Sequence, residues 1–456
     1  TELVVKEAFQ YRAVPEDTTT AESAWNAIQT CREVYNHALT QEYRPAPDHN
    51  KPSYNTMQNM LPKWKREWSE WKGVYSKCLQ MAVRRIKNSE SVLDSLEERG
   101  FDVGRLKWKS PREYRSIKYN QSGFDVDNNT GQDGHAIVNL SKIGNFNLDY
   151  HRPLPTKQNQ NAKITEVILK KQKTGDWTVS IVVKYDADYP EKPTVENISI
   201  EDTVGIDLGI TKFIHDSDNR AFARLDEEKD RERVERRHRS LSRKQYESEN
   251  WNKARQSLVR AYERLRNRRE DYREKLACWY TQEYDAVFLE DLDVASMTQQ
   301  DRNARNISAM SWYATIQAFE RHGNKNGCHI VKVPPEGTTK RCAKCGVGSD
   351  KPLWVREHSC PSCGFTVDRD YNSSLEVQQL GLKKLGVEFE KEELGLGQSE
   401  YSSNTMSVEA GISEGSHHRD ALLSNTAVNL AIEAENLMRE HRSPTLKERT
   451  AKAVSE

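Results

Sequence analysis

The chain has 456 residues, and 69 Lys and Arg residues balance 69 Asp and Glu residues, so net charge gives no argument for a polyanion partner. This length exceeds what one simple core needs, and we expect two or three domains. No apolar run approaches the length of a membrane span, and the N-terminus shows no charged-then-apolar leader. We therefore expect a cytoplasmic protein with no membrane partner.

The charges are distributed unevenly along the chain. Residues 224–275 contain 18 Lys and Arg against 12 Asp and Glu, whereas residues 388–440 contain 11 acidic and 3 basic residues. A basic middle with an acidic tail favours a polyanion partner for one part of the chain. The alternative is that both stretches are simply solvated faces.

The N-terminal part predicts a small β-barrel interrupted by helices. Residues 3–14 alternate as a strand, and Pro15 ends it. Apolar residues recur with helical spacing from Thr18 to Arg99. From Gly100 to about Asp188 the runs are typical of strands and turns, including a hairpin with its turn at Thr174-Gly175.

The C-terminal part predicts a different domain, which begins near Ile198. Residues 203–223 form short adjacent strands, residues 229–283 form a long basic helical stretch, and residues 284–294 form a buried strand that ends in acids. A helix, a strand, a cysteine block and another helix follow. After Leu385 the tail is rich in Ser, Glu and Gly, and we expect it to be mobile.

The cysteine block has the spacing of a structural zinc ribbon. Two Cys-x2-Cys pairs are separated by fourteen residues, and Gly346 and Gly364 directly follow the pairs, where each chain must turn tightly. Four thiolates leave no open coordination position, so the zinc would be structural, with His358 as a bystander. The predicted ligands are Cys342, Cys345, Cys360 and Cys363.

Three acids are candidates for a second metal site. Asp207 lies inside an apolar strand, Glu290 directly follows the buried run "AVFL", and Asp370 opens a helix beyond the cysteine block. Two strand acids and one helix-start acid are typical of an RNase H-like site, in which three carboxylates hold two Mg²⁺ ions. Taken singly, they could be a turn residue, a surface acid and a helix cap. Their neighbours compete for the same roles: Asp291, Asp293 and Asp368.

Three segments resemble the RuvC motifs of the TnpB (OrfB) proteins of insertion sequences, which are relatives of the type V CRISPR effector nucleases. These segments are "GIDLGI", "FLEDLDV" and "DRDYNSS", and the zinc ribbon lies in the family's place between the second and the third. Upstream, "CREVYNHAL", "YNQSGF" and "HRPLP" are also similar to TnpB segments. The resemblance covers roughly residues 3–380.

The resemblance implies an RNA-guided DNA endonuclease. Asp207, Glu290 and Asp370 would be the Mg²⁺ ligands and catalytic residues, and the four cysteines would bind zinc. The partners would be DNA and a guide RNA from the element's own end, with a separate transposase performing strand transfer. Family members are commonly basic, whereas this chain is neutral. A surface richer in acid than is common in the family suggests a halophilic prokaryotic source, in which a nucleoid-associated protein works in high salt.

The resemblance and the patterns together predict a mixed α/β and β fold. The domains would be a wedge-like β-barrel in 1–17 and 100–197, a recognition-like helical insertion in 18–99, an RNase H-like (RuvC) nuclease domain in 198–336 and 366–386, the inserted zinc ribbon in 337–365, and an acidic tail in 387–456. Basic and polar residues on one helix face and around Trp108 would contact nucleic acid. They are Lys77, Gln80, Arg84, Arg105, Lys107 and Lys109.

Three other functions remain open from the sequence. A guide-directed DNA-binding regulator without nuclease activity would have lost a catalytic acid, and all three are present. A DNA-strand transferase could use the same acids directly in transposition. A zinc-ribbon interaction module would leave Asp207 in its apolar strand without an explanation.

Overall fold

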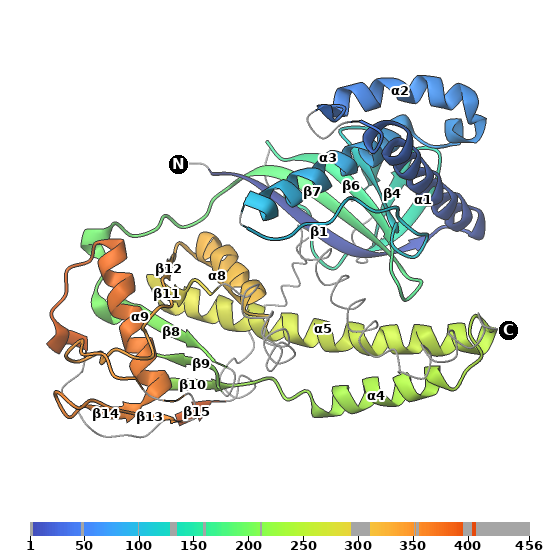
Figure 1. The fold of residues 1–456 in the computed structure, drawn as a ribbon. Helices are drawn as coiled ribbons and strands as arrows, with labels where there is room; N and C mark the ends of the chain where they lie inside the picture. The colour runs from blue at the N-terminus through green and yellow to red at the C-terminus, as the bar shows by residue number, and fades with distance from the viewer. Residues whose placement is uncertain are drawn as a thin grey trace. The chain divides into compact units, whose positions relative to one another are not determined.

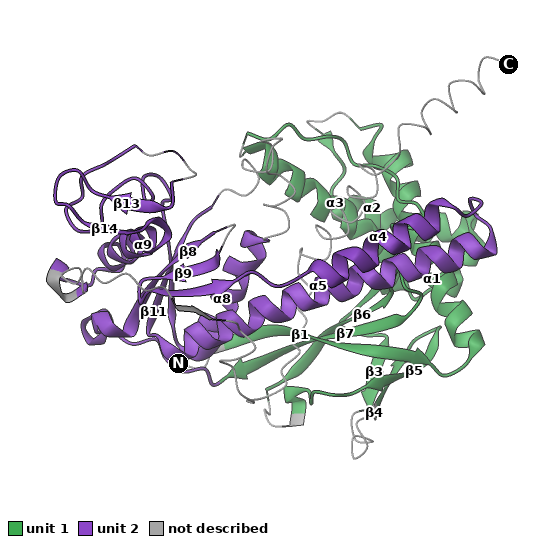
Figure 2. Ribbon diagram, turned by 90° about the horizontal axis from the view of Figure 1, so that it is seen from below, with its two compact units in different colours: residues 1–187, 418–456 green, residues 188–417 purple. Residues whose placement is uncertain are grey.

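The computed structural model describes residues 3–46, 50–98, 100–127, 135–157, 161–209, 212–292, 311–350, 352, 355–394 and 404–406. These residues fall into two compact units, the first ending at Ala187 and the second beginning at Asp188 (Figure 2). None of the helices within these ranges is long and apolar enough to cross a membrane.

Unit 1 combines seven strands with helices that connect the first strand to the second. Its elements are β1 (Leu3–Pro15), α1 (Thr18–Ala38), η1 (Leu39–Tyr43), α2 (Tyr54–Glu67), η3 (Ser69–Gly73), α3 (Ser76–Glu98), β2 (Ser116–Asn120), β3 (Phe124–Asp127), β4 (His135–Leu140), β5 (Gly144–Asp149), η5 (Pro155–Lys157), β6 (Lys163–Lys171) and β7 (Trp177–Ala187). Helix α1 begins where the Asp17 carboxylate accepts a hydrogen bond from Thr20 N at 2.6 Å, an N-cap that satisfies one free N–H of the first turn.

The strands of unit 1 form one antiparallel sheet in the order β2-β6-β7-β1-β5-β4-β3. Strand β1 pairs with β7 from Leu3 to Ala13, but with β5 only from Ala13 to Pro15. Helices α1 and α3 share one apolar core with this sheet (Figure 1). The predicted strand at 3–14, the helices and the hairpin at Thr174-Gly175 are therefore confirmed. The predicted barrel is an open sheet in the described residues, because β2 and β3 are its edges and do not pair.

Unit 2 contains a second sheet with helices on both faces. Its elements are η6 (Val195–Asn197), η7 (Ile200–Asp202), β8 (Thr203–Leu208), β9 (Lys212–Asp216), β10 (Arg220–Ala223), α4 (Glu228–Ser242), α5 (Glu249–Glu283), β11 (Ala286–Glu290), α8 (Trp312–Asn326), β12 (His329–Val333), β13 (Glu357–Ser359), β14 (Thr366–Asp368), α9 (Arg369–Leu385), η8 (Lys391–Leu394) and β15 (Asn404–Met406). The strand order is β12-β11-β8-β9-β10-β15, and β12, β11 and β8 run parallel.

Side chains of β8 and β11 alternate between the two faces of this sheet. Helices α5 and α8 cover one face and α9 covers the other (Figure 1). The side chains of β8 and β11 that pack in the core with α5 and α8 are Val204, Ile206, Leu208, Val287 and Leu289. Ala286 and Phe288 belong to the α9 core. By the same alternation, Asp207 and Glu290 face α9.

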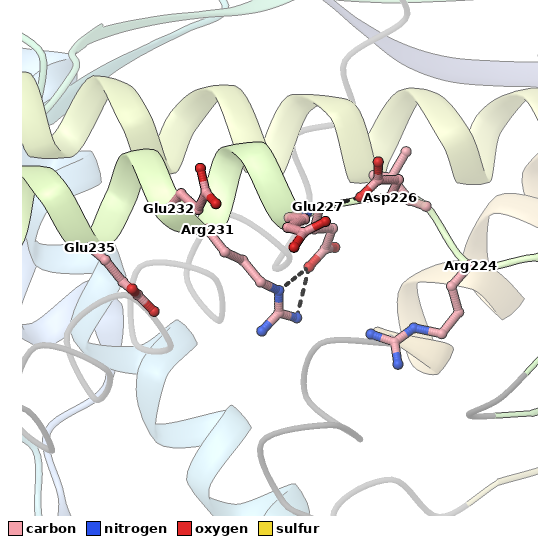
Figure 3. Close-up of a pocket in the computed structure, with 8 residues that line it drawn as sticks. Arg224, Asp226, Glu227, Arg231, Glu232 and Glu235 are labelled. Carbon is pink, nitrogen blue, oxygen red and sulfur yellow. Dashed lines mark hydrogen bonds and ion pairs between the residues drawn. The ribbon is translucent and has the colours of Figure 1, made fainter.

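The predicted helical stretch 229–283 is confirmed, and it consists of two helices, α4 and α5. The helix breaks before Ser248, whose hydroxyl accepts from Trp251 N and caps α5. Glu227, before α4, accepts a hydrogen bond from Arg231 Nε at 2.9 Å (Figure 3). It also accepts one from Arg269 Nη2 of α5 at 2.7 Å. Buried acids paired with arginines therefore join two helices that share little apolar surface.

The acidic tail lies largely outside the described residues. Within them, η8 follows α9, and β15 pairs in parallel with β10 through Asn404, Thr405 and Met406. The sequence analysis did not predict this strand.

Candidate functional site

Helix α9 packs closely against strand β8. Gln378 Nε2 donates to the Thr203 carbonyl oxygen at 3.0 Å, and a Cβ on Gly205 would lie 2.2 Å from the Ser374 carbonyl oxygen. Two strand residues span about 6.6 Å, which is close to the rise of about 5.4 Å in one helical turn. Contacts between β8 and α9 therefore recur every two residues of the strand and every four residues of the helix. The next step of this series pairs Asp207 with Asp370.

Strand β11 brings the third acid to the same place. Leu289 pairs with Ile206 in the parallel ladder, so Glu290 follows beside Asp207 at the next position of each strand. The Thr338 hydroxyl donates to Glu290 Oε1 at 2.6 Å and holds the carboxylate. Glu290 is 6% exposed, whereas its competitor Asp291 is exposed and gives its N–H to the Val333 carbonyl.

The charges of Glu290 and Asp370 act on the buried carboxyl of Asp207. Burial raises the pKa of Asp207 well above its ordinary value, and the charges of Glu290 and Asp370 raise it further, against smaller opposing effects of Ser373 and Arg369. Burial also raises the pKa of Glu290, and the hydrogen bond from Thr338 opposes the shift. A raised pKa means that the ionised form of a buried acid is not fully compensated by positive charge, and bound cations would supply that charge.

Asp368 and Asp370 have different roles at the start of α9. Asp368 Oδ1 accepts hydrogen bonds from Asp370 N at 2.8 Å and from Tyr371 N at 3.3 Å, which makes Asp368 the N-cap. The carboxylate of Asp370 is partly exposed and lies 3.6 Å from Arg356 Nη1. Of the competing acids, Asp293 lies outside the described residues.

Two residues of β9 also reach this site, and neither was among the predicted site residues. His215 lies directly opposite Asp207 in the antiparallel ladder, so the two side chains share a face. Lys212 Nζ lies 3.1 Å from Asp368 Oδ2. The alternation of "KFIHD" after the Asp207 strand could have indicated His215, given the hairpin register.

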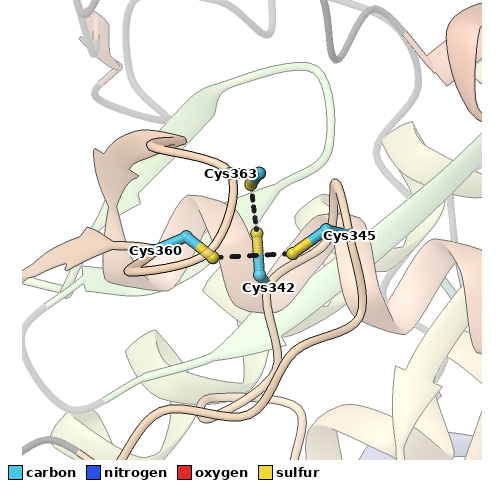
Figure 4. Close-up of side chains that lie close together, drawn as sticks. All are labelled: Cys342, Cys345, Cys360 and Cys363. Carbon is cyan, nitrogen blue, oxygen red and sulfur yellow. Dashed lines mark hydrogen bonds between the residues drawn. The ribbon is translucent and has the colours of Figure 1, made fainter.

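The four predicted cysteines form one cluster (Figure 4). The Sγ atoms of Cys342 and Cys363 are 3.7 Å apart, and those of Cys345 and Cys360 are 3.5 Å apart. A tetrahedral zinc with bonds of about 2.3 Å separates its sulfurs by about 3.8 Å, whereas a disulfide needs about 2.05 Å. The cluster is therefore compatible with zinc, and His358 is not part of it.

Both halves of the cluster repeat one turn. Gly346 N donates to the Cys342 carbonyl at 2.7 Å, and Gly364 N donates to the Cys360 carbonyl at 3.0 Å. The two glycines have φ of +78° and +73°, a backbone region that favours glycine. The predicted reason for glycine after each cysteine pair is thus confirmed.

The cysteine cluster is attached to the helix that carries Asp370. Asn372 accepts a hydrogen bond from Ala343 N at 3.0 Å and donates one to the Arg341 carbonyl at 2.7 Å. Gln379 donates to the Ala343 carbonyl at 2.8 Å. Strand β14 also runs directly into α9 at Asp368. The ribbon therefore fixes where α9 begins, and with it the position of Asp370.

The predicted nucleic-acid residues all lie on unit 1, on two segments. Lys77, Gln80 and Arg84 lie along α3, with Lys77 and Gln80 partly exposed and Arg84 exposed over the Tyr54 ring at 5.0 Å. Arg105 and Lys107 are exposed. The backbone of Lys109 is held by Asn36 through hydrogen bonds of 2.9 and 3.0 Å.

Comparison with known proteins gives two matches to family models. Residues 180–301 match OrfB_IS605, described as "Probable transposase", and residues 312–377 match the Cas12f1-like TNB domain. Among solved structures, a Cas12f1–sgRNA–target DNA complex aligns with a TM-score of 0.46 and 13% identity, over 82% of this chain and 99% of that one.

Two relatives extend over most of the chain. A protein of Streptomyces pristinaespiralis, named as an RNA-guided DNA endonuclease, is 30% identical over 423 residues, covering 90% of this chain and 98% of its own. InsQ of Escherichia coli K12, named in the same way, is 25% identical over 369 residues, covering 77% and 86%. The chain therefore belongs to the TnpB (OrfB) family, as its motifs predict.

Proposed function

We propose that this protein is an RNA-guided DNA endonuclease that hydrolyses phosphodiester bonds at a RuvC-like site in unit 2. The relatives' names support the class of activity. The observation that carries the proposal is that Asp207 is buried on the α9 face of the sheet, where the charges of Glu290 and Asp370 both act on it.

These carboxylates fit the ligand set that Mg²⁺ takes. They offer hard oxygen donors, and the pKa of Asp207 is raised by burial and by the charges of Glu290 and Asp370, which a bound cation would offset. Two Mg²⁺ ions held by the three acids would activate a water and stabilise the leaving oxygen. The chain's own contribution is orientation: Thr338 fixes Glu290, and Asp368 fixes the first turn of α9.

The four cysteines would hold a structural zinc. Burial raises the pKa of Cys342 to about 12, whereas backbone N–H groups of Cys363 and Ser362 lower the pKa of Cys360 to about 6. A cation bonded to all four sulfurs would keep every one of them ionised. The ion would thereby hold Ala343 and Arg341 in place for Asn372 and Gln379.

The nucleic-acid partners would be a guide RNA from the element's own end and the target DNA. Lys77, Gln80, Arg84, Arg105, Lys107 and Lys109 are proposed contacts. Strand transfer would belong to a separate transposase. The chain keeps all three acids, and Glu290 and Asp370 both act on Asp207, which supports this function over an inactive DNA-binding regulator. A transferase that uses the same acids would differ in its product.

The experiment is cleavage of a plasmid library by protein co-expressed with RNA from its own locus, over a range of salt concentrations. Guide-matched, Mg²⁺-dependent linear product is expected. Joined ends instead of linear product would indicate the transferase, and guide-matched binding without cutting would indicate the regulator.

A further inference from the structure

A second group of possible metal ligands lies beside the three acids. His215, Asp368 and Asp370 each offer one ligand atom, and these atoms lie within 4.8 Å of one another. We call these residues the His215 cluster. They come from β9, the end of β14 and the first turn of α9. His215 is 1% exposed, so its ring is fixed within the protein rather than free in solvent.

The imidazole of His215 is oriented as a ligand would be. Its Nε2 lies 3.4 Å from Asn219 Oδ1, and its Nδ1 lies 3.5 Å from Asp368 Oδ1. The ammonium group of Lys212 can only donate, and its Nζ lies 3.4 Å from Nδ1, so Nδ1 faces the position of a cation. Histidines that bind metals are held in this way, with the second ring nitrogen donating to an oxygen.

A positive charge already occupies the space between these groups. Lys212 Nζ lies 3.1 Å from Asp368 Oδ2 and 3.4 Å from His215 Nδ1. The lysine side chain is 20% exposed and ends a flexible stem, so it can move toward solvent when another cation arrives. Asp368 and His215 thus both point at one cation position.

We propose that His215, Asp368 and Asp370 form a mixed nitrogen and oxygen site for a divalent first-row transition metal, which displaces Lys212. A nitrogen ligand favours such ions over Mg²⁺, which takes oxygen ligands. The inference rests on the proposed function only through Asp370, which both ligand sets share. The His215 cluster would be a position that prefers Mn²⁺ to Mg²⁺, beside the proposed Mg²⁺ ligands.

The test is Mn²⁺ binding to the purified full-length protein, without RNA or DNA, followed by pulsed electron paramagnetic resonance. Wild type should show Mn²⁺ bonded directly to a nitrogen. His215→Gln should lose the nitrogen coupling and weaken binding of that ion about tenfold or more. Lys212→Met should tighten binding several-fold, because the competing ammonium is gone.

A matched control is His322→Gln, a partly buried histidine of α8 that contacts Glu274. It should leave the nitrogen coupling unchanged. Absence of nitrogen coupling in wild type, its persistence in His215→Gln, or weaker Mn²⁺ binding in Lys212→Met would each overturn the proposal. The wild-type spectrum needs no variant to fold. These outcomes leave guide-dependent cleavage untouched, and failure of cleavage leaves the Mn²⁺ result standing.

Discussion

Gly205 of β8 and Ser374 of α9 touch backbone to backbone: a Cβ added to the glycine would lie 2.2 Å from the serine carbonyl oxygen. No side chain separates the strand from the helix at this point. The close approach lets Asp207, two residues along the strand, and Asp370, one turn back along the helix, act on the same space. The catalytic geometry that we propose depends on this contact.

Gly205→Ala should loosen the contact between β8 and α9. The added methyl group meets backbone atoms that cannot move aside, and overpacking of this kind costs about 1–3 kcal/mol. Hydrogen exchange of β8 and α9 amides should become faster by the factor that this loss of stability implies. Gly348→Ala is the control, because nothing lies within 4 Å of a Cβ there. Equal exchange in both variants would contradict the packing argument.

Asp207→Asn should stabilise the metal-free protein by about 1–2 kcal/mol, the scale of a buried group's desolvation penalty. The raised pKa of Asp207 means that its folded form favours the proton. Its contribution to stability is therefore complete below the unfolded pKa and is lost as pH rises through the folded pKa. Chemical unfolding from pH 5 to 8 in chelator measures this loss of unfolding free energy. The loss should be absent in Asp207→Asn, because an amide does not titrate. The exposed Asp202→Asn should change nothing, and a destabilised Asp207→Asn would refute the account.

The purified chain should contain one zinc ion, and Cys342→Ser should lose it. Loss of the ion releases Ala343 and Arg341, the partners of Asn372 and Gln379, so the first turns of α9 should exchange faster. Metal analysis and hydrogen exchange provide the two readouts. Cys278→Ser, outside the cluster, is the control. It should keep its zinc and the slow hydrogen exchange of the first turns of α9. A zinc-free wild type would contradict this prediction.

Glu227→Gln should separate α4 from α5. Burial raises the pKa of Glu227, but Arg269 and Arg231 outweigh that effect and leave its pKa below the ordinary value. The carboxylate therefore stabilises the hairpin above its unfolded pKa, and this stabilisation is lost as pH falls through the lower folded pKa. The side chains of Arg269 and Arg231 are 24% and 37% exposed, so solvent partly screens both ion pairs. We therefore expect Glu227→Gln to lower the free energy of unfolding by about 1–2 kcal/mol.

Exchange rates of α4 amides, measured at pH 7 and near pH 4, would test this hairpin prediction. Exposed Glu235→Gln on the same helix should behave as wild type. If both variants exchange alike, the ion pairs do not hold the helices together.

The parts of this site that follow from local pattern were predictable from sequence. Cysteine spacing locates the ribbon, and strand alternation places Asp207 and Glu290 on one face. His215 was missed because its position depends on the β8–β9 register, which pairs it with Asp207. Thr338 was missed because its partner Glu290 is distant in sequence.

The features of the fold that were not predicted have similar physical causes. The break between α4 and α5 contains neither Gly nor Pro, and Glu247 adopts a φ of +62° without them. Only the Ser248 cap marks it locally. Strand β15 depends on pairing with β10, across an interval of more than 180 residues, and no local pattern encodes that contact. Whether a sheet closes into a barrel likewise depends on its edges.

The central claim is that Asp207, Glu290 and Asp370 together perform phosphodiester hydrolysis. The most direct test measures cleavage of a guide-matched duplex by wild type, Asp207→Asn, Glu290→Gln and Asp370→Asn, with guide and target binding measured for each. The account predicts that every variant binds its target as wild type does and cleaves it roughly 10³-fold or more slowly. Cleavage within tenfold of wild type in any of the three would contradict it.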